Sequence, residues 1–240
     1  MHFSKIKILA AAVTCAALFT ACAATAQEGE AEQKKSGSTY HVQQGEKQAM
    51  LEQTFADLLA SIRSNVSTDS LLTYITDTSE YWLDTLEYAA KTENEEQLLN
   101  RKFCEIYAIL RYRIYERERL WTVPEDRMLA LVLAQRGILE RLTELKLGPM
   151  EFKNDRGTVG LASSPKVPVL LFVWDDVKWE LDLRASLPLV TKGFESIGVK
   201  KEWTNTKLAI YLLEKEFRYD YSFIDKSLYE PMPSIAAPSL

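Results

Sequence analysis

Apolar residues recur every three or four positions through residues 46–147, which is the spacing of one face of an α-helix. The first such stripe consists of Met50, Leu51, Phe55, Leu58, Leu59 and Ile62. Helix start signals follow at Asp77 with Glu80, at Asn94 with Gln97 and at Thr122 before Pro124. Leu147-Gly148-Pro149 is a stop signal. The spacing therefore predicts a series of helices over residues 46–147.

Beyond residue 149 the apolar period changes to two, which is typical of β-strands. Residues 167–174 form an apolar run, Asp175 and Asp176 form a tight turn, and apolar and polar residues then alternate over residues 177–183. A further strand pair is expected within residues 151–162. The sequence thus predicts an α+β fold in which the helical layer packs on a small antiparallel sheet over residues 150–184. Closing helices are expected over residues 187–217.

The folded part is expected to be a single α+β domain of residues 46–229. Residues 23–45 contain mainly Ala, Gln, Glu, Lys, Gly and Ser and almost nothing apolar to bury, which predicts a flexible tether. Residues 230–240 contain Pro231, Pro233 and Pro238 and are expected to form a loose tail.

Residues 1–22 have the order of a secretory signal peptide, with Lys5 and Lys7 before an apolar stretch. That stretch of about 12 residues is shorter than the roughly 20 that span a bilayer, so we expect a signal that is removed. The segment ending at Cys22 resembles the bacterial lipoprotein signal, in which this cysteine receives the lipid. The alternative is cleavage after Ala26, which would leave a soluble periplasmic or secreted protein. The lipid-anchored form on the periplasmic side of the envelope is favoured, because a cysteine directly after the apolar stretch is otherwise unexplained.

Charge and cysteine content narrow the chemistry of the 240-residue chain. The net charge is −5, and removal of a signal that holds Lys5 and Lys7 but no acid takes it to −7. An acidic protein lacks the basic footprint that nucleic acid requires. Cys104 is the one cysteine beyond the signal, so no internal disulfide is expected.

The two histidines, His2 and His41, both precede the expected domain, which excludes histidine-dependent triads and histidine-ligated zinc from it. No phosphate loop, dinucleotide fingerprint or metal-spaced acid cluster is present in the sequence. We therefore expect no cofactor, no metal and no nucleic-acid partner.

The hairpin of residues 169–183 carries a resemblance to a known family. Its apolar strand, its acidic turn at Asp175 and Asp176, and the following Trp179-Glu180-Leu181-Asp182-Leu183 are similar to the terminal strands of nuclear-transport-factor-2-like domains, which occur in envelope lipoproteins. The resemblance implies that helices come first and that the sheet forms a cone-shaped apolar pocket. It does not name a function, because that fold carries enzymes, binding proteins and scaffolds.

Four residues are candidates for such a pocket. Asp182 alternates to the polar face of its strand and is the best acid-base candidate, whereas Trp179 falls on the apolar face. Arg113 lies next to an apolar helical stripe and could be buried against a carboxylate, although the charge run around it is typical of a solvated helix surface. Tyr107 is one of several helix tyrosines that bury area while keeping a polar tip.

Two functions remain open from the sequence. The first is a non-catalytic binding or interaction module, anchored by lipid on Cys22, that binds a partner protein or a small apolar ligand in a groove between helices and sheet. The alternative is a histidine-independent enzyme that uses Asp182 in a cone-like pocket. No residue is assigned as catalytic on the first hypothesis.

Overall fold

The computed structural model describes residues 44–64, 66–122, 126–133, 147–162, 164–217 and 224–232. The predicted signal peptide with Cys22, nearly all of the predicted tether and residues 233–240 of the predicted tail lie outside the described residues. So do residues 134–146, where the sequence predicts a continuing helix. Within the described part of the chain, no helix is both long and apolar enough to cross a membrane.

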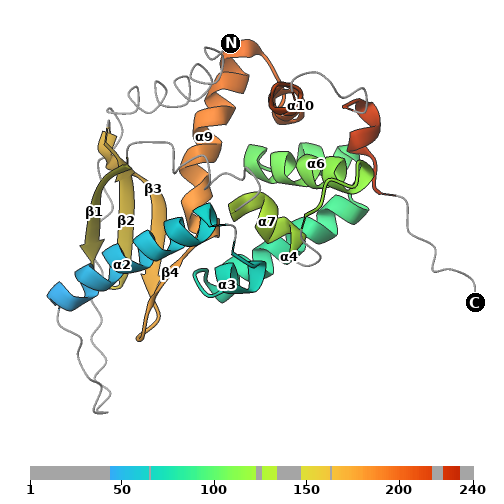
Figure 1. Cartoon of the computed structure of the whole chain (residues 1–240). Helices are drawn as coiled ribbons and strands as arrows, with labels where there is room; N and C mark the ends of the chain where they lie inside the picture. Colours follow the sequence, from blue (N-terminus) through green and yellow to red (C-terminus); the bar gives the residue numbers. More distant parts are fainter. Residues whose placement is uncertain are drawn as a thin grey trace, which may run out of the picture.

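The predicted α+β fold is confirmed, with helices both before and after an antiparallel sheet (Figure 1). The helices before the sheet are α2 (Gln44–Arg63), α3 (Thr68–Leu72), α4 (Asp77–Thr92), α5 (Glu95–Leu99), α6 (Phe103–Arg117) and α7 (Arg127–Leu133). The strands are β1 (Leu147–Lys153), β2 (Arg156–Leu161), β3 (Ser164–Trp174) and β4 (Trp179–Leu181). After the sheet come α9 (Leu183–Lys201), α10 (Asn205–Glu216) and the 3₁₀ turn η1 (Lys226–Tyr229).

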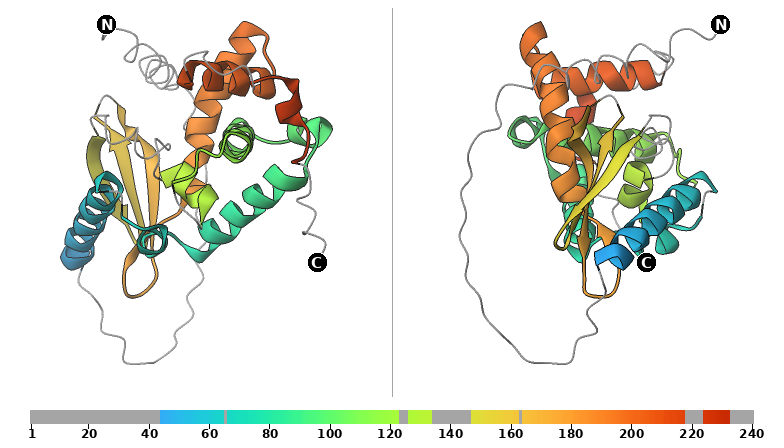
Figure 2. Two further views of the ribbon diagram at one scale, coloured as in Figure 1. Left: turned by 45° about the vertical axis from the view of Figure 1, so that its right-hand side comes forward. Right: turned by 90° about the vertical axis from the view of Figure 1, so that its left-hand side faces the viewer.

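The four strands pair in chain order, β1-β2-β3-β4, and every pair is antiparallel. Helices α2 and α9 lie on opposite faces of this sheet (Figure 2). The rings of Phe55 on α2 and Phe172 on β3 meet edge to face at 6.0 Å. A Cβ atom at Gly157 on β2 would lie 2.5 Å from the Leu51 side chain, so a larger residue there would force that side chain to shift.

The remaining helices pack beside the sheet around α6, which contacts α4, α7, α9, α10 and η1 (Figures 1 and 2). Buried residues of the sheet and of the helices belong to one hydrophobic cluster. Of the helices that precede the sheet in sequence, α2 lies across it and α3 to α7 lie at its side. Of the helices that the sequence predicts to pack on the sheet from residues 46–147, α2 therefore covers a face of it, and the others lie beside it.

The structure corrects one of the predicted helix starts and confirms another. Helix α4 begins at Asp77, but its cap is Thr76, whose hydroxyl accepts the Ser79 amide at 3.2 Å; Asp77 does not act as the cap. The predicted capping box of Asn94 and Gln97 is confirmed, yet the helix that it opens, α5, ends at Leu99. The next helix, α6, begins at Phe103 after three further residues.

The predicted boundaries of the sheet also need correction. Leu147 begins β1 instead of ending a helix, and the ladder between β1 and β2 is irregular between Leu147 and Met150. Strand β4 ends at Leu181, and α9 begins at Leu183 instead of near residue 187. Val177, expected in the last strand, lies in the preceding turn and is 74% exposed.

Candidate functional site

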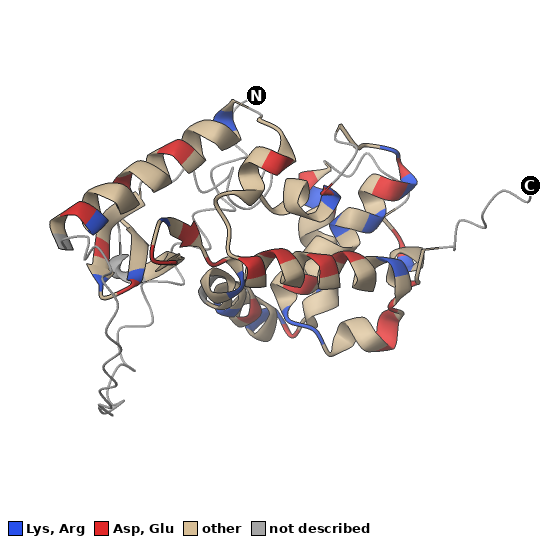
Figure 3. Cartoon of the chain, turned by 90° about the horizontal axis from the view of Figure 1, so that it is seen from below, with Lys and Arg blue, Asp and Glu red and all other residues tan. Residues whose placement is uncertain are grey.

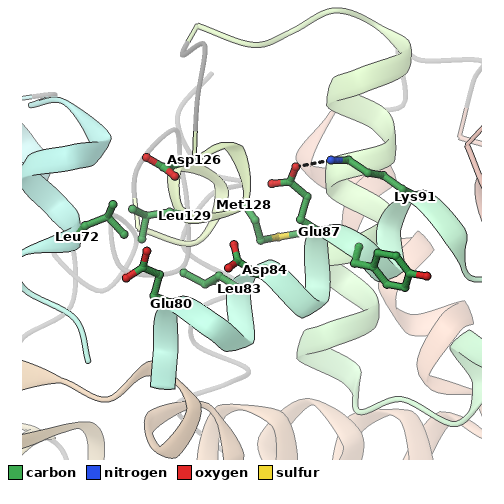
Figure 4. A pocket seen from close by; sticks show the side chains of 10 residues that line it. Leu72, Glu80, Leu83, Asp84, Glu87, Lys91, Asp126, Met128 and Leu129 are labelled. Carbon is green, nitrogen blue, oxygen red and sulfur yellow. Dashed lines mark hydrogen bonds and ion pairs between the residues drawn. The ribbon is translucent and has the colours of Figure 1, made fainter. Parts of the chain in front are cut away.

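An open cleft of about 430 Å³ lies where α3, α4 and α7 meet (Figure 4). Its floor is apolar and consists of Leu72, Leu83, Met128 and Leu129. Leu83, Met128 and Leu129 are at most 3% exposed, so they belong to the packed core as well as to the cleft. This cleft is formed by helices alone, so it is not the groove between helices and sheet that the sequence predicts.

Carboxylates surround the apolar floor. Glu80, Asp84 and Glu87 follow at intervals of four and three residues along α4 and therefore share one side of the helix. Asp126 lines the cleft from the start of α7, and among the described residues of the lining Lys91 is the one basic side chain. Figure 3 views the molecule from the side of α4 and shows the acids following one another along a helix. Four carboxylates against one ammonium give the cleft a strongly negative potential.

Glu87 is already engaged within the protein. Its Oε1 atom accepts hydrogen bonds from Lys91 Nζ at 2.6 Å and from the Tyr112 hydroxyl at 3.0 Å. Burial and the adjacent Glu87 carboxylate raise the pKa of Tyr112, so its hydroxyl keeps its proton and remains a donor. Glu87 therefore fixes the position of α4 against α6.

Glu80 and Asp84, in contrast, have exposed side chains that make no hydrogen bond or ion pair with any side chain in the described part of the chain. Their carboxylates rise from α4 beside the apolar floor in Figure 4. They are thus available to an external cation.

Asp126 reaches the cleft through an unusual backbone conformation. Its φ angle is 46°, in the left-handed region that Asp and Asn enter more readily than most residues. Its carbonyl oxygen accepts the Ala130 amide at 2.9 Å and so starts α7. The strained residue is therefore held in place by the helix that follows it.

Asp182 does not lie on the wet face of a strand, as the sequence predicts, but caps α9. Its Oδ1 atom accepts the amide of Ala185 at 2.8 Å, and its own amide donates to the Leu171 carbonyl at 2.9 Å. The Ser186 hydroxyl donates to the Asp182 carbonyl at 2.6 Å. These contacts give Asp182 a structural role at the junction between β4 and α9.

Trp179 is a core residue of the sheet, 1% exposed. Its ring lies 5.5 Å from that of Trp174 and 5.7 Å from that of Phe152. Its Nε1 atom donates to the Lys47 carbonyl at 2.7 Å, which ties α2 to β4. The side chain therefore anchors a helix on the sheet.

Arg113 is fully buried, but backbone carbonyls and not a carboxylate surround it. Its guanidinium donates to the carbonyl oxygens of Ala90 at 2.7 Å, Leu228 at 2.8 Å and Ala89 at 3.3 Å, and to that of Glu93. Burial lowers the pKa of Arg113 to about 10, which still leaves it charged at neutral pH. The expected burial of Arg113 is confirmed, whereas the expected carboxylate partner is wrong.

Tyr107 lies at the interface of α6 and α10, where its hydroxyl donates to the Glu216 carboxylate. Arg111, 2% exposed, pairs with the same carboxylate at 3.0 Å, so a second arginine of the run is buried. None of Asp182, Trp179, Arg113 and Tyr107 is among the residues that line the cleft. The structure does not bring these four predicted residues together there.

The described residues offer little for covalent or metal chemistry. They contain no group of three or more His, Cys, Asp or Glu side chains that could hold a metal ion. Cys104 is buried, and this burial raises its pKa to about 12, which keeps it as an unreactive thiol at neutral pH.

No family model, no curated protein and no solved structure matches this chain. The resemblance of residues 169–183 to nuclear-transport-factor-2-like domains therefore stays a prediction.

Proposed function

We propose that the protein is a non-catalytic binding module of the cell envelope, held to the membrane by lipid on Cys22. The cleft between α3, α4 and α7 binds a positively charged partner segment that also carries apolar side chains. The observation that supports this proposal is the pairing of an apolar floor with the exposed carboxylates of Glu80 and Asp84.

The two parts of the cleft contribute differently to binding. Burying one leucine-sized side chain stabilises a complex by about 1.5–3 kcal/mol. An exposed ion pair contributes roughly 1 kcal/mol or less. Leu83, Met128 and Leu129 are already almost fully buried, so the apolar floor offers a contact surface to an apolar side chain of the partner, whereas the carboxylates select a cationic partner and orient it.

The enzyme hypothesis has less support. The Asp182 carboxylate already accepts a backbone amide as a helix cap, and Glu87 is held between Lys91 and Tyr112. A general base must instead reach a proton of the substrate.

A labelled synthetic peptide of alternating lysine and leucine pairs tests the cleft, with binding to the purified protein followed by fluorescence anisotropy. The double variant Glu80→Gln/Asp84→Asn removes two exposed charges from the cleft and is expected to weaken binding about tenfold. Glu52→Gln/Asp57→Asn removes two exposed charges from α2 and serves as the matched control. Equal weakening by both double variants would show that the peptide responds only to net charge and would contradict the proposal.

The anchor is tested separately, by metabolic labelling with palmitate and cell fractionation. The wild type is expected to take up label and to sediment with membranes, whereas Cys22→Ala is expected to do neither. Membrane attachment of the Cys22→Ala protein equal to that of the wild type would contradict lipid anchoring.

A further inference from the structure

A second surface, distant from the cleft, forms where α9 turns into α10. Glu202 ends α9 with a φ angle of 55°, and the amide of Trp203 donates to the Gly198 carbonyl at 2.9 Å. Thr204 then caps α10. The turn places the Trp203 ring 5.0 Å from that of Tyr211 on α10.

Lysines surround these two rings. The Nζ atoms of Lys201 and Lys207 lie 4.9 Å and 5.2 Å from the centroid of Trp203, and that of Lys215 lies 4.3 Å from the centroid of Tyr211. Lys200 is exposed in the last turn of α9. We call this surface, together with Val199, the α9–α10 corner.

The α9–α10 corner differs from the chain as a whole in charge. Between residues 199 and 215 it carries four lysines against the acids Glu202 and Glu214, although the chain as a whole has a net charge of −5. Val199, 78% exposed, adds an apolar side chain to this basic surface. Exposed basic and apolar side chains thus occur at this turn together with the half-buried rings of Trp203 and Tyr211.

We infer that the α9–α10 corner docks on the surface of an anionic phospholipid bilayer. Tryptophan and tyrosine favour the headgroup level, where the ring is buried and the polar edge stays wet. Lysine stems extend along apolar surface while their ammonium groups reach the lipid phosphates. Each lysine near an anionic surface adds a modest attraction, so four of them outweigh the repulsion of Glu202 and Glu214.

The position of the α9–α10 corner in the fold agrees with this docking. In Figures 1 and 2 the corner lies at the top of the molecule and α4 near the bottom, and α6 packs against both α4 and α10. Anionic lipid would repel the carboxylates of the cleft. Docking through the corner therefore turns the cleft away from the bilayer, toward a partner in solution.

The inference rests on the proposed lipid anchor at Cys22 and on the predicted tether of residues 23–45, which together hold the domain near a membrane. An extended chain of the length of residues 23–45 spans about 75 Å. A domain of this size is about 40 Å across. The anchor point therefore leaves the corner free to turn toward the membrane.

Vesicle co-sedimentation of the purified chain carrying Cys22→Ala tests the docking, because no acyl group then contributes. Vesicles of phosphatidylglycerol mixed with phosphatidylcholine are compared with vesicles of phosphatidylcholine alone, which report apolar binding through residues 1–22. Lys5 and Lys7 of that segment also attract anionic lipid, and because every variant retains them, the comparison between variants cancels their contribution. The protein is expected to prefer the anionic vesicles, and added salt is expected to weaken that preference. Lys207→Glu/Lys215→Glu is expected to weaken binding to the anionic vesicles by at least about tenfold.

The matched control, Lys153→Glu/Arg63→Glu, changes the net charge equally at exposed residues of β1 and α2, and is expected to retain the binding. Equal binding to both kinds of vesicle, or an equal loss in the two double variants, would overturn the inference. A salt-sensitive dimer seen by light scattering, without vesicle binding, would overturn it too and assign the corner to a second copy of the chain. Because neither palmitate nor the cleft enters this measurement, its failure is distinct from that of the proposed function.

Discussion

The Nη1 atom of Arg113 lies 2.8 Å from the carbonyl oxygen of Leu228, and its Nε atom lies 2.7 Å from that of Ala90. Arg113 of α6 thus joins the last turn of α4 to η1. Leu228 of η1 lies 115 residues after Arg113 in the chain. The last carbonyls of a helix lack partners within the helix. A cation near them is also attracted by the partial negative charge at the C-terminal end of the helix. Arg113 satisfies both needs in the core.

Replacement of Arg113 by methionine is expected to lower the free energy of unfolding by about 3 kcal/mol or more. The apolar side chain fills part of the volume but leaves several buried carbonyls without donors, each at a cost of about 1–3 kcal/mol. Urea denaturation of the purified protein measures the change. Arg63→Met, at an exposed position on α2, is the control and is expected to stay within about 0.5 kcal/mol of the wild type. Similar stabilities for the two variants would show that water replaces the guanidinium.

The ion pair of Glu93 and Arg101 gives the stability a defined pH dependence. Arg101 donates through Nε and Nη2 to the two carboxylate oxygens of Glu93, and each hydrogen bond is 2.7 Å long. These bonds hold the pKa of Glu93 below its ordinary value of 4.5. A carboxyl whose pKa is lower in the folded state stabilises the fold above its unfolded pKa. It loses that contribution as the pH falls through the folded pKa.

We therefore expect Glu93→Gln to lower the free energy of unfolding by about 1.5 kcal/mol near pH 7. The difference from the wild type is expected to shrink as the pH falls below 4.5 and through the lowered pKa of Glu93. Urea denaturation across this pH range measures it, with Glu96→Gln, an exposed neighbour, as the control. A difference that stays constant down to the acid end would show that the charge of Glu93 is not involved.

Local signals in the sequence predict several elements correctly. The apolar stripe over residues 50–62 is helical, and Leu51, Phe55, Leu58 and Ile62 of that stripe are buried. The turn at Asp175 is confirmed as well, since its carboxylate accepts the amides of Val177 and Lys178. Such features depend on residues close in sequence, which is why a pattern can predict them.

The cleft could not be predicted in this way. Glu80 and Asp84 have the spacing of an ordinary solvated helix face, and the packing of α7 against α4 adds the apolar side chains of Met128 and Leu129 beside them. Leu129 lies 45 residues beyond Asp84 in the chain. Period and capping signals carry no information on contacts at this separation. The same limit explains Arg113, whose position near an apolar stripe indicates burial but not the carbonyls that it meets.

Asp182 illustrates how an alternating pattern can mislead at the end of a strand. Alternation assigns it to the polar face, yet the chain has already left the sheet there to begin α9. Asp182→Ala is expected to lower the free energy of unfolding by about 1 kcal/mol, whereas Asp182→Asn is expected to remain close to the wild type because asparagine caps equally well. Thermal or urea unfolding separates the two. An asparagine variant as unstable as the alanine variant would show that the charge, and not the cap, matters at this site.

Tyr88 and Tyr81 form a natural test pair for the cleft. Both lie on α4 and are 69% and 70% exposed, but only Tyr88 is part of the cleft lining. An arginine or lysine of a bound segment that lies over the Tyr88 ring gains about 0.5–1 kcal/mol, so Tyr88→Ala is expected to weaken binding of the lysine and leucine peptide about two- to fivefold. Tyr81→Ala is expected to leave the affinity unchanged. Because both side chains are mostly in solvent, the free energy of unfolding should move by less than about 0.5 kcal/mol in either variant. An equal loss of affinity in the two variants would place the peptide along the outer side of α4 instead of in the cleft.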